Sequence, residues 1–146
     1  METIAFHSYR GGVGKTLLSV NSAVKLANLG NKVCLVDFDL RAPSFQSYLS
    51  FNSIVSHSME KASSFTEFII CKAEPNEIIS HTNESSFDCV LLDVGILQKS
   101  TKVRKKLAQH SEGRILAKLF EFIRYCISEK YDFLIIDCMP GITIVL

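Results

Sequence analysis

The sequence predicts an α/β protein with three layers, in which helices flank a mainly parallel sheet. Short apolar runs that suit buried strands alternate along the chain with segments whose apolar residues recur at helical spacing. A glycine-rich loop follows the first of these strands and opens the first helix. Two later apolar runs end in an acidic residue, Asp37 and Asp137. The expected sheet therefore delivers polar residues to the edge where its parallel strands end.

Length and composition favour one packed domain over residues 1–146. Hydrophobic residues make up 47% of the chain and charged residues 21%, as in ordinary globular proteins. No apolar run approaches the roughly 20 residues of a membrane-spanning helix, and the N-terminus lacks a basic, apolar leader. We therefore expect a cytoplasmic protein. The five cysteines form no C-x-x-C pair, so we expect reduced, mostly buried thiols.

The first quarter of the chain predicts a strand, a loop, a helix and a second strand. Residues 3–7 are β-prone and lead into the glycine loop at 8–16. From Lys15 onward, apolar residues recur at helical spacing for about four turns. Gly30 stands where a left-handed cap would end this helix. Residues 32–37 contain a nearly continuous apolar run, typical of a strand covered on both faces.

The rest of the chain predicts shorter elements and then a long helix. Residues 40–62 read as a loop with at most a helical turn, 64–71 and 75–79 as short helices, and 87–94 as a third strand. Ser111 is placed to cap a helix that leads to a fourth strand at residues 131–137. The apolar stripe of this helix consists of Ile115, Leu116, Leu119, Phe120, Ile123, Cys126 and Ile127.

The glycine loop has the residues that a phosphate site requires. A loop that opens a helix presents backbone N–H groups and the positive end of the helix dipole. Gly11, Gly12 and Gly14 allow the backbone to approach a ligand closely. Lys15 can reach the β and γ phosphates of a nucleotide, and the Thr16 hydroxyl can ligate Mg²⁺.

The loop resembles the deviant Walker A motif of the ParA/MinD/Mrp group of P-loop ATPases. The general pattern G-x-x-x-x-G-K-[ST] meets Tyr9 at its first glycine, whereas residues 10–16, Arg-Gly-Gly-Val-Gly-Lys-Thr, match the deviant form K-G-G-x-G-K-[ST]. The resemblance implies a P-loop NTPase fold that binds ATP and Mg²⁺, with Lys15 catalytic. It places these residues around the nucleotide: Arg10, Gly11, Gly12, Val13, Gly14, Lys15, Thr16 and Leu17.

The same resemblance assigns a role to Arg10 in a dimer. In this family the lysine before the glycine pair reaches the ATP phosphates of a partner subunit, so that nucleotide binding closes a sandwich dimer. Arg10 occupies that position and keeps its charge, with a fork of donors that suits phosphate. The resemblance therefore implies an ATP-dependent homodimer in which Arg10 has a catalytic role.

Two acidic segments resemble the remaining motifs of the family. Residues 37–44 look like its D-x-D segment, which implies that Asp37 lies near the magnesium and that Asp39 orients the attacking water. The fourth strand ends in Asp137 and a Met-Pro-Gly turn, like the Walker B strand. The implied magnesium residues are Thr16, Asp37 and Asp137. Asp93 also ends an apolar run and competes with Asp137, but no Pro-Gly turn follows it.

The resemblance covers the whole chain, yet family members continue for roughly another hundred residues, within the usual range of domain sizes. We therefore expect a fragment, a truncated gene product or half of a split protein, with an unpaired sheet edge and poor turnover in isolation. Two rival functions are a noncatalytic nucleotide-binding module and a capsule-type tyrosine-kinase-like domain. Residues 37–41 suggest the kinase, but the chain has no terminal tyrosine cluster.

A basic run follows the third predicted strand. It contains Lys99, Lys102, Arg104, Lys105 and Lys106, with no acidic residue among them. Such a run is typical of a solvated charged loop, and it is also suited to nonspecific contact with DNA or another anionic surface.

Overall fold

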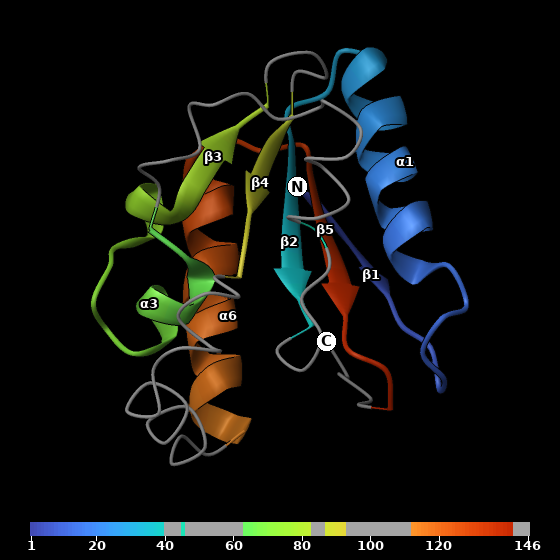
Figure 1. Ribbon diagram of the computed structural model, residues 1–146. Helices are drawn as coiled ribbons and strands as arrows, with labels where there is room; N and C mark the ends of the chain where they lie inside the picture. Colours follow the sequence, from blue (N-terminus) through green and yellow to red (C-terminus); the bar gives the residue numbers. More distant parts are fainter. Residues whose placement is uncertain (40–44, 46–62, 83–86, 93–111, 142–146) are drawn as a thin grey trace.

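The computed structural model describes residues 1–39, 45, 63–82, 87–92 and 112–141. The elements in chain order are β1 (Glu2–Phe6), α1 (Lys15–Asn28), β2 (Val33–Phe38), α3 (Phe65–Ile69), the 3-10 helix η2 (Pro75–Ile78), β3 (Ile79–His81), β4 (Asp88–Val90), α6 (Glu112–Ser128) and β5 (Phe133–Cys138). Within this part of the chain they form one five-stranded sheet in the order β1-β5-β2-β4-β3. Helix α1 covers one face, and α3 and α6 cover the other (Figure 1).

The sheet is parallel except at one edge. Strand β5 lies between β1 and β2, and β2 pairs in turn with β4, all in parallel register. Among the strands of the described residues, only β3 runs antiparallel, against β4. Parallel strands bring their carboxyl ends to one edge of the sheet, where α/β proteins bind ligands. The predicted three-layer fold with a mainly parallel sheet is confirmed.

Helix α1 packs closely against the sheet because its buried face is made of small residues. Ser19, Val20, Ala23 and Ala27 are the buried residues of this helix. At its C-terminus, Gly30 has a φ of 88° and donates its N–H to the carbonyl of Ala27, as expected for a left-handed cap. The predicted helix and its glycine stop are confirmed.

The opposite layer is built on aromatic packing between α3 and α6. Phe65 and Phe68 of α3 lie within 6.3 Å, centroid to centroid, of Phe122 on α6. Ser64 and Glu67 form a capping box that starts α3. The two short helices that the sequence predicts in this region are therefore present, whereas the three-residue strand β3 was not predicted.

The apolar stripe predicted for α6 is only partly buried. Leu119 and Cys126 are fully buried, together with Phe122, which lies outside the predicted stripe. Phe120 and Ile127 are 48% and 56% exposed. The stripe is therefore wider than the buried face, because helical periodicity reports apolar spacing and not the width of the layer beneath the helix.

The remaining predicted elements are present with shifted ends. Strand β5 runs one residue beyond the predicted end of the fourth strand, and β4 is shorter than the predicted third strand. All five cysteines are free thiols, and all except Cys71 are buried, as expected. In the described ranges, no helix is both long and apolar enough to cross a membrane.

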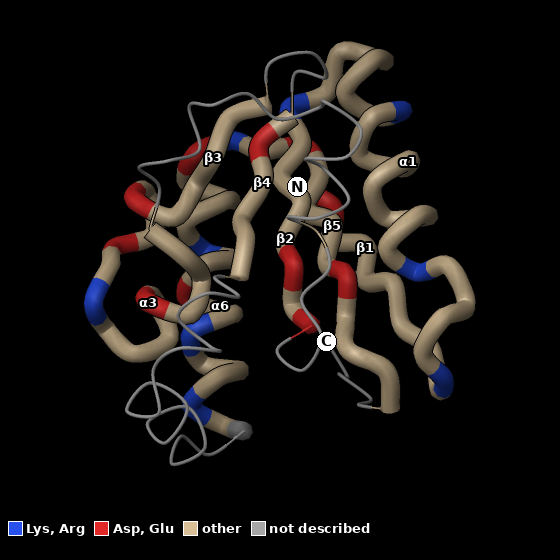
Figure 2. The backbone as a smooth tube through the Cα atoms, viewed as in Figure 1, with Lys and Arg blue, Asp and Glu red and all other residues tan. Residues whose placement is uncertain are grey.

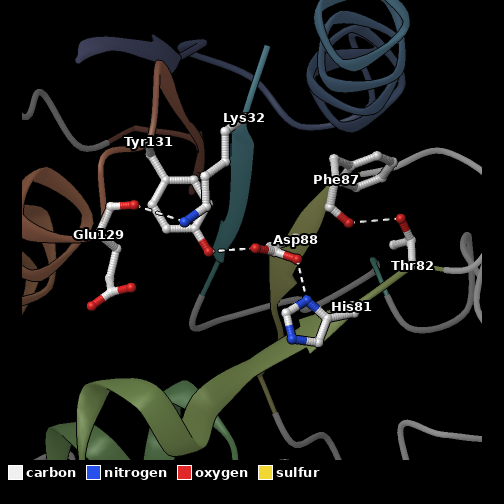
Figure 3. Close-up of polar contacts among 7 residues, drawn as sticks. All are labelled: Lys32, His81, Thr82, Phe87, Asp88, Glu129 and Tyr131. Carbon is white, nitrogen blue, oxygen red and sulfur yellow. Dashed lines mark hydrogen bonds and ion pairs between the residues drawn. The ribbon is translucent and has the colours of Figure 1, made fainter. Parts of the chain in front are cut away.

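A polar cluster closes the end of the sheet where the parallel strands begin (Figure 3). The carboxylate of Asp88 accepts a hydrogen bond from the Tyr131 hydroxyl and pairs with Nδ1 of His81. Lys32 Nζ lies 4.3 Å above the Tyr131 ring and donates to the Glu129 carbonyl at 2.7 Å. Burial, and then the bond to Asp88, raise the pKa of Tyr131, so its hydroxyl stays protonated and acts as a donor.

Candidate nucleotide site

The loop between β1 and α1 requires backbone conformations that suit glycine. Gly12 and Gly14 have φ angles of 74° and 89°, in the left-handed region. A Cβ built at Gly11, Gly12 or Gly14 would meet no heavy atom within 4 Å, so the space over this loop is open. A ligand can therefore approach the backbone of the loop closely.

Two hydrogen bonds hold the beginning of the loop. Ser8 Oγ donates to the carbonyl of Arg10 at 2.6 Å. The N–H of Gly141, in the turn after β5, donates to the carbonyl of Ser8 at 3.1 Å. The loop is thereby tied to the segment that follows Asp137, although the two are far apart in the sequence.

The first turn of α1 is suited to an anion. Gly14 is the N-cap residue and provides no side-chain cap, and the first turn contains no acidic residue. A helix N-terminus is equivalent to about half a positive charge. Lys15 adds a full positive charge at this point and lowers the pKa of Asp137. No protein carboxylate in the first turn competes with a bound phosphate for this positive potential.

Two buried carboxylates lie side by side at the carboxyl end of the sheet. Asp37 on β2 and Asp137 on β5 are register partners, and they are 1% and 2% exposed. Figure 2 shows these acidic positions on neighbouring strands at the same edge. Burying two like charges this close is unfavourable unless a positive group or a proton compensates them.

In each of these carboxylates, one oxygen accepts a hydrogen bond and the other has no partner among the described residues. Thr16 Oγ1 donates to Asp137 Oδ2 at 2.6 Å, and the Asp39 N–H donates to Asp37 Oδ1 at 3.1 Å. Among the described residues, the other oxygen of each buried carboxylate, Oδ2 of Asp37 and Oδ1 of Asp137, has no hydrogen-bond partner. Unpaired buried oxygens of this kind call for an explanation such as a bound ion.

The pKa shifts follow from this environment. Burial raises the pKa of Asp37 to about 7, with a further increase from the charge of Asp137, while the Asp39 backbone hydrogen bond opposes the rise. Burial also raises the pKa of Asp137, against the Thr16 hydrogen bond and the Lys15 charge, which lower it. Both carboxylates therefore lie where a nearby cation would favour their charged forms.

The oxygen ligands at this edge suit Mg²⁺, which keeps several waters, better than a metal that protein side chains alone coordinate. In the parts of the chain that the structure describes, no three His, Cys, Asp or Glu side chains group closely enough to hold a metal ion. The site offers instead the carboxylates of Asp37 and Asp137 and the hydroxyl of Thr16. Mg²⁺ usually binds through one or two carboxylates, substrate phosphates and several waters. The two unpaired oxygens are suitable ligands for it or for its waters.

Most of the predicted site residues meet at this edge. Lys15, Thr16, Asp37 and Asp137 lie together, and Asp39 is close enough for its charge to raise the pKa of both buried carboxylates. The three glycines form the open loop beside them. The sequence therefore predicted which residues come together, whereas their roles toward a nucleotide stay predictions.

Three residues predicted to be near the nucleotide are exposed on the loop and the first turn of α1. Arg10 is exposed on the loop, and Val13 and Leu17 are 56% and 50% exposed. The remaining candidates lie outside the described residues: Asp93, Lys99, Lys102, Arg104, Lys105 and Lys106.

Sequence reasoning missed two features of the site. The bond from Gly141 to Ser8 joins backbone atoms and has no side-chain signature. Phe45, which is fully buried in the core on the α1 side, falls within the stretch predicted as a loop. Neither the Gly141–Ser8 bond nor the burial of Phe45 has a signal in the local sequence, because both depend on how distant segments pack together.

Comparison with known families shows to which family this chain belongs. A family model described as an AAA domain matches residues 1–146. The chain belongs to this AAA domain family. Together with the relatives below, the match supports the resemblance drawn from the deviant Walker A motif, that of a portion of a ParA/MinD-type P-loop ATPase.

Two curated relatives are a septum protein and a sporulation protein. The septum site-determining protein MinD of Thermotoga maritima is 27% identical over 140 residues, which cover 95% of this chain and 44% of MinD. The sporulation initiation inhibitor protein Soj of Bacillus subtilis is 26% identical over 142 residues, which cover 95% of this chain and 50% of Soj. The chain thus spans about half the length of these relatives.

Solved structures share the fold. The cell division ATPase MinD of Pyrococcus furiosus superposes with a TM-score of 0.69 at 23% identity, over 97% of this chain and 52% of that one. Cobyrinic acid a,c-diamide synthase of Mycobacterium smegmatis, with bound ATP analog and magnesium, gives 0.70 at 21% identity, over 96% and 52%. The kinase domain of Escherichia coli tyrosine kinase ETK gives 0.69 at 21% identity, over 94% and 46%.

Proposed function

We propose that this chain binds ATP with Mg²⁺ at the edge formed by the glycine loop, Asp37 and Asp137, and contributes to ATP hydrolysis coupled to a nucleotide-dependent homodimer in the cytoplasm. The observation that carries the proposal is the pair of buried carboxylates with unpaired oxygens beside a helix N-terminus that has no acidic residue. Such an arrangement combines a cation site with an anion site. Magnesium triphosphate supplies both charges in one ligand.

The glycine loop and α1 bind the phosphates in this proposal. Backbone N–H groups from Gly11 to Leu17 converge on them, and the positive φ angles of Gly12 and Gly14 keep the backbone open to the ligand. Lys15 neutralises the charge that develops on the transferred phosphoryl group. Phosphoryl transfer in this proposal requires no covalent step by the protein.

Thr16, Asp37 and Asp137 hold the magnesium, directly or through its waters. When bound, Mg²⁺ neutralises charge on the β and γ phosphates. The Thr16 hydroxyl already lies 2.6 Å from Asp137, so the two prospective ligands are positioned before any metal arrives. Asp39 follows directly after β2 and is only half-buried, which suits a residue that orients an attacking water.

Arg10 acts across the proposed dimer. Its side chain is exposed on the loop, together with Tyr9 at 87% and Val13 at 56% exposure. A guanidinium group matches phosphate geometry well and suits contact with the nucleotide of a partner subunit. MinD and Soj relatives are named for septum placement and sporulation. By that analogy, the dimer switch would serve the positioning of a cargo.

The experiment pairs ATP binding with phosphate release. We expect the wild-type chain to bind ATP only with Mg²⁺, and Lys15→Ala to abolish binding. Asp39→Asn should keep ATP binding and lose hydrolysis. Binding without any phosphate release by the wild type would favour the noncatalytic module instead. No Mg²⁺-dependent binding would overturn the proposal.

The tyrosine kinase alternative rests on a shared fold and on the sequence of residues 37–41. The ETK kinase domain superposes well, but at 21% identity the likeness shows the fold alone. The ATPase interpretation therefore agrees with more of the observations.

A further inference from the structure

The polar cluster at the amino ends of the parallel strands presents an accessible imidazole. His81 on β3 and Asp88 on β4 are register partners, and the carboxylate of Asp88 pairs with Nδ1 of His81. The His81 side chain is 81% exposed, whereas that of Asp88 is only 15% exposed. A mostly buried carboxylate therefore holds an imidazole that faces solvent.

Tyr131 fixes the carboxylate of Asp88 from the other side. Its hydroxyl donates to Oδ2 of Asp88, and its raised pKa keeps that hydroxyl protonated. The Tyr131 side chain is buried, with Lys32 Nζ 4.3 Å from the centre of its ring. Each oxygen of Asp88 thus has its own partner, so the carboxylate cannot turn without losing both contacts.

Two hydrogen bonds beside the pair fix how β3 and β4 meet. The N–H and the Oγ1 of Thr82 both donate to the carbonyl of Phe87, at 3.2 and 2.6 Å. Both of these residues are buried. Because Thr82 follows His81 and Phe87 precedes Asp88, these bonds keep the imidazole opposite the carboxylate. The pair is therefore positioned before any ligand arrives.

The carboxylate determines which nitrogen of His81 carries the proton. An ionised carboxylate only accepts hydrogen bonds, so in the neutral ring Nδ1 donates to Asp88 and the lone pair lies on Nε2. Figure 3 shows this second ring nitrogen turned away from Asp88. When Nε2 bonds to an electrophile, the ring becomes positively charged and Asp88 balances that charge. A nucleophile, a carboxylate and a third group that orients the carboxylate are the parts of an activated nucleophile.

We propose that Nε2 of His81 is a phosphoryl acceptor for small donors of the phosphoramidate class. The Nε2 lone pair bonds to phosphorus while the P–N bond of the donor breaks, and the protonated donor nitrogen leaves as ammonia with the electron pair of that bond. The product is a phosphorylated imidazolium ring beside the carboxylate of Asp88. Asp88 and Tyr131 are positioning residues. The inference does not depend on ATP binding at the glycine loop.

The surroundings of His81 suit a phosphoryl group better than a metal ion or an acyl group. Within the described residues, no three His, Cys, Asp or Glu side chains group closely enough to hold a metal ion. Acyl transfer requires donors aimed at an oxyanion, whereas phosphoryl transfer depends chiefly on a positioned acceptor and on compensated charge. At a side chain as exposed as that of His81, the oxygens of the phosphoryl group stay in water.

The test treats the folded 146-residue chain with potassium phosphoramidate, without nucleotide or Mg²⁺. Mass spectrometry maps the modified residues under conditions that keep acid-labile phosphohistidine intact. His7 is the matched control, because it is also an exposed histidine. We expect His81 to be phosphorylated about tenfold faster than His7 or more, because balancing the charge that forms on the ring lowers the barrier.

Three variants separate activation from folding. Asp88→Asn keeps the shape of the side chain and removes its charge, so phosphorylation of His81 should slow to about the rate of His7. Tyr131→Phe releases one oxygen of the carboxylate and should give an intermediate rate. His7→Ala should leave the rate at His81 unchanged. Thermal unfolding of each variant alone checks that it folds.

Nitrogen-15 NMR of the His81 ring tests the positioning role of Asp88 directly. At mildly alkaline pH, the wild type should carry its ring proton on Nδ1 and leave Nε2 unprotonated. Asp88→Asn should shift the ring toward the tautomer that is protonated on Nε2. An ion pair with only a structural role would not require this change.

The inference is overturned by equal phosphorylation rates at His7 and His81 in the folded wild type, or by a His81 ring that carries its proton on Nε2. Both readouts use the wild type, so they decide the question even where a variant does not fold. An unchanged rate at His81 in folded Asp88→Asn overturns it as well. Because neither ATP nor Mg²⁺ is present, failure of this test and failure of ATP binding are separate results.

Discussion

Thr16 Oγ1 donates a 2.6 Å hydrogen bond to Asp137 Oδ2, across 121 positions of sequence. The bond joins the second residue of α1 to the residue before the end of β5. It places a hydroxyl and a carboxylate, two oxygen ligands that Mg²⁺ accepts, in direct contact. In the proposed function this contact is the preformed part of the magnesium site.

Replacing Thr16 tests that contact. Thr16→Ala should weaken Mg²⁺-dependent ATP binding by about tenfold or more, because a hydrogen bond to a charged group contributes roughly 1.5–3 kcal/mol and about 1.4 kcal/mol is a factor of ten. Thr16→Ser keeps the hydroxyl and should bind nearly as well as the wild type. ATP titration with and without Mg²⁺ measures both. Equal affinities for the alanine variant and the wild type would contradict a metal role for Thr16.

Asp37 should make the free chain less stable as pH rises. Its folded pKa of about 7 lies above the ordinary value of 3.8 for this carboxyl group, so the folded state binds the proton more tightly. The stabilisation is complete below about pH 4, falls between pH 4 and pH 7, and is lost above the folded pKa. Asp37→Asn should remove this part of the pH dependence and raise stability at pH 8 by roughly 1–4 kcal/mol, since one pKa unit corresponds to about 1.4 kcal/mol.

Urea unfolding at pH 4.5, 6 and 8 measures the effect of Asp37 as the difference between wild type and variant. Glu2→Gln, at an exposed residue, is the control and should follow the wild type. A difference between Asp37→Asn and wild type that stays constant across these pH values would show that Asp37 does not titrate in this window.

The backbone at Gly14 should tolerate substitution less well than the backbone at Gly11. Gly14 has a φ of 89°, and an L-residue in the left-handed region costs about 1–2 kcal/mol. Gly11 has no such angle, and both sites have open space for a Cβ. Gly14→Ala should therefore lower the free energy of unfolding by about that amount, with a much smaller change for Gly11→Ala. Denaturant unfolding compares them, and equal losses would refute the conformational explanation.

The polar cluster at the opposite end of the sheet should affect stability and leave ligand binding unchanged. Tyr131→Phe removes the hydroxyl that donates to Asp88 and leaves a partly buried carboxylate with one partner fewer. We expect a loss of roughly 1–3 kcal/mol in unfolding free energy. ATP affinity of the folded variant should match the wild type. A large loss of affinity would show that the two ends of the sheet are coupled.

The parts of the fold that the sequence predicted are those with local signals. The glycine loop, the start of α1 and the strand ends at Asp37 and Asp137 each follow from a few neighbouring residues. Parallel strand order then brings the aspartates together, because strands of a parallel sheet end at one edge. The sequence therefore predicted that these residues lie together, and their roles toward a nucleotide stay predictions.

The features that escaped prediction depend on tertiary contact. Strand β3 has three residues and exists through its pairing with β4. Phe120 and Ile127 have the spacing of core residues, but no described element covers them. Periodicity could not distinguish the buried part of the stripe from its exposed part. The bond from Gly141 to Ser8 likewise depends on where two loops meet.

The most direct test of the central claim follows the backbone amides of the folded chain during titration with ATP and Mg²⁺. We expect the NMR shifts to concentrate at residues 11–17, Asp37 and Asp137, to require Mg²⁺, and to disappear in Lys15→Ala. Saturating ligand that leaves these amides unchanged, or that shifts a different set, would contradict the account.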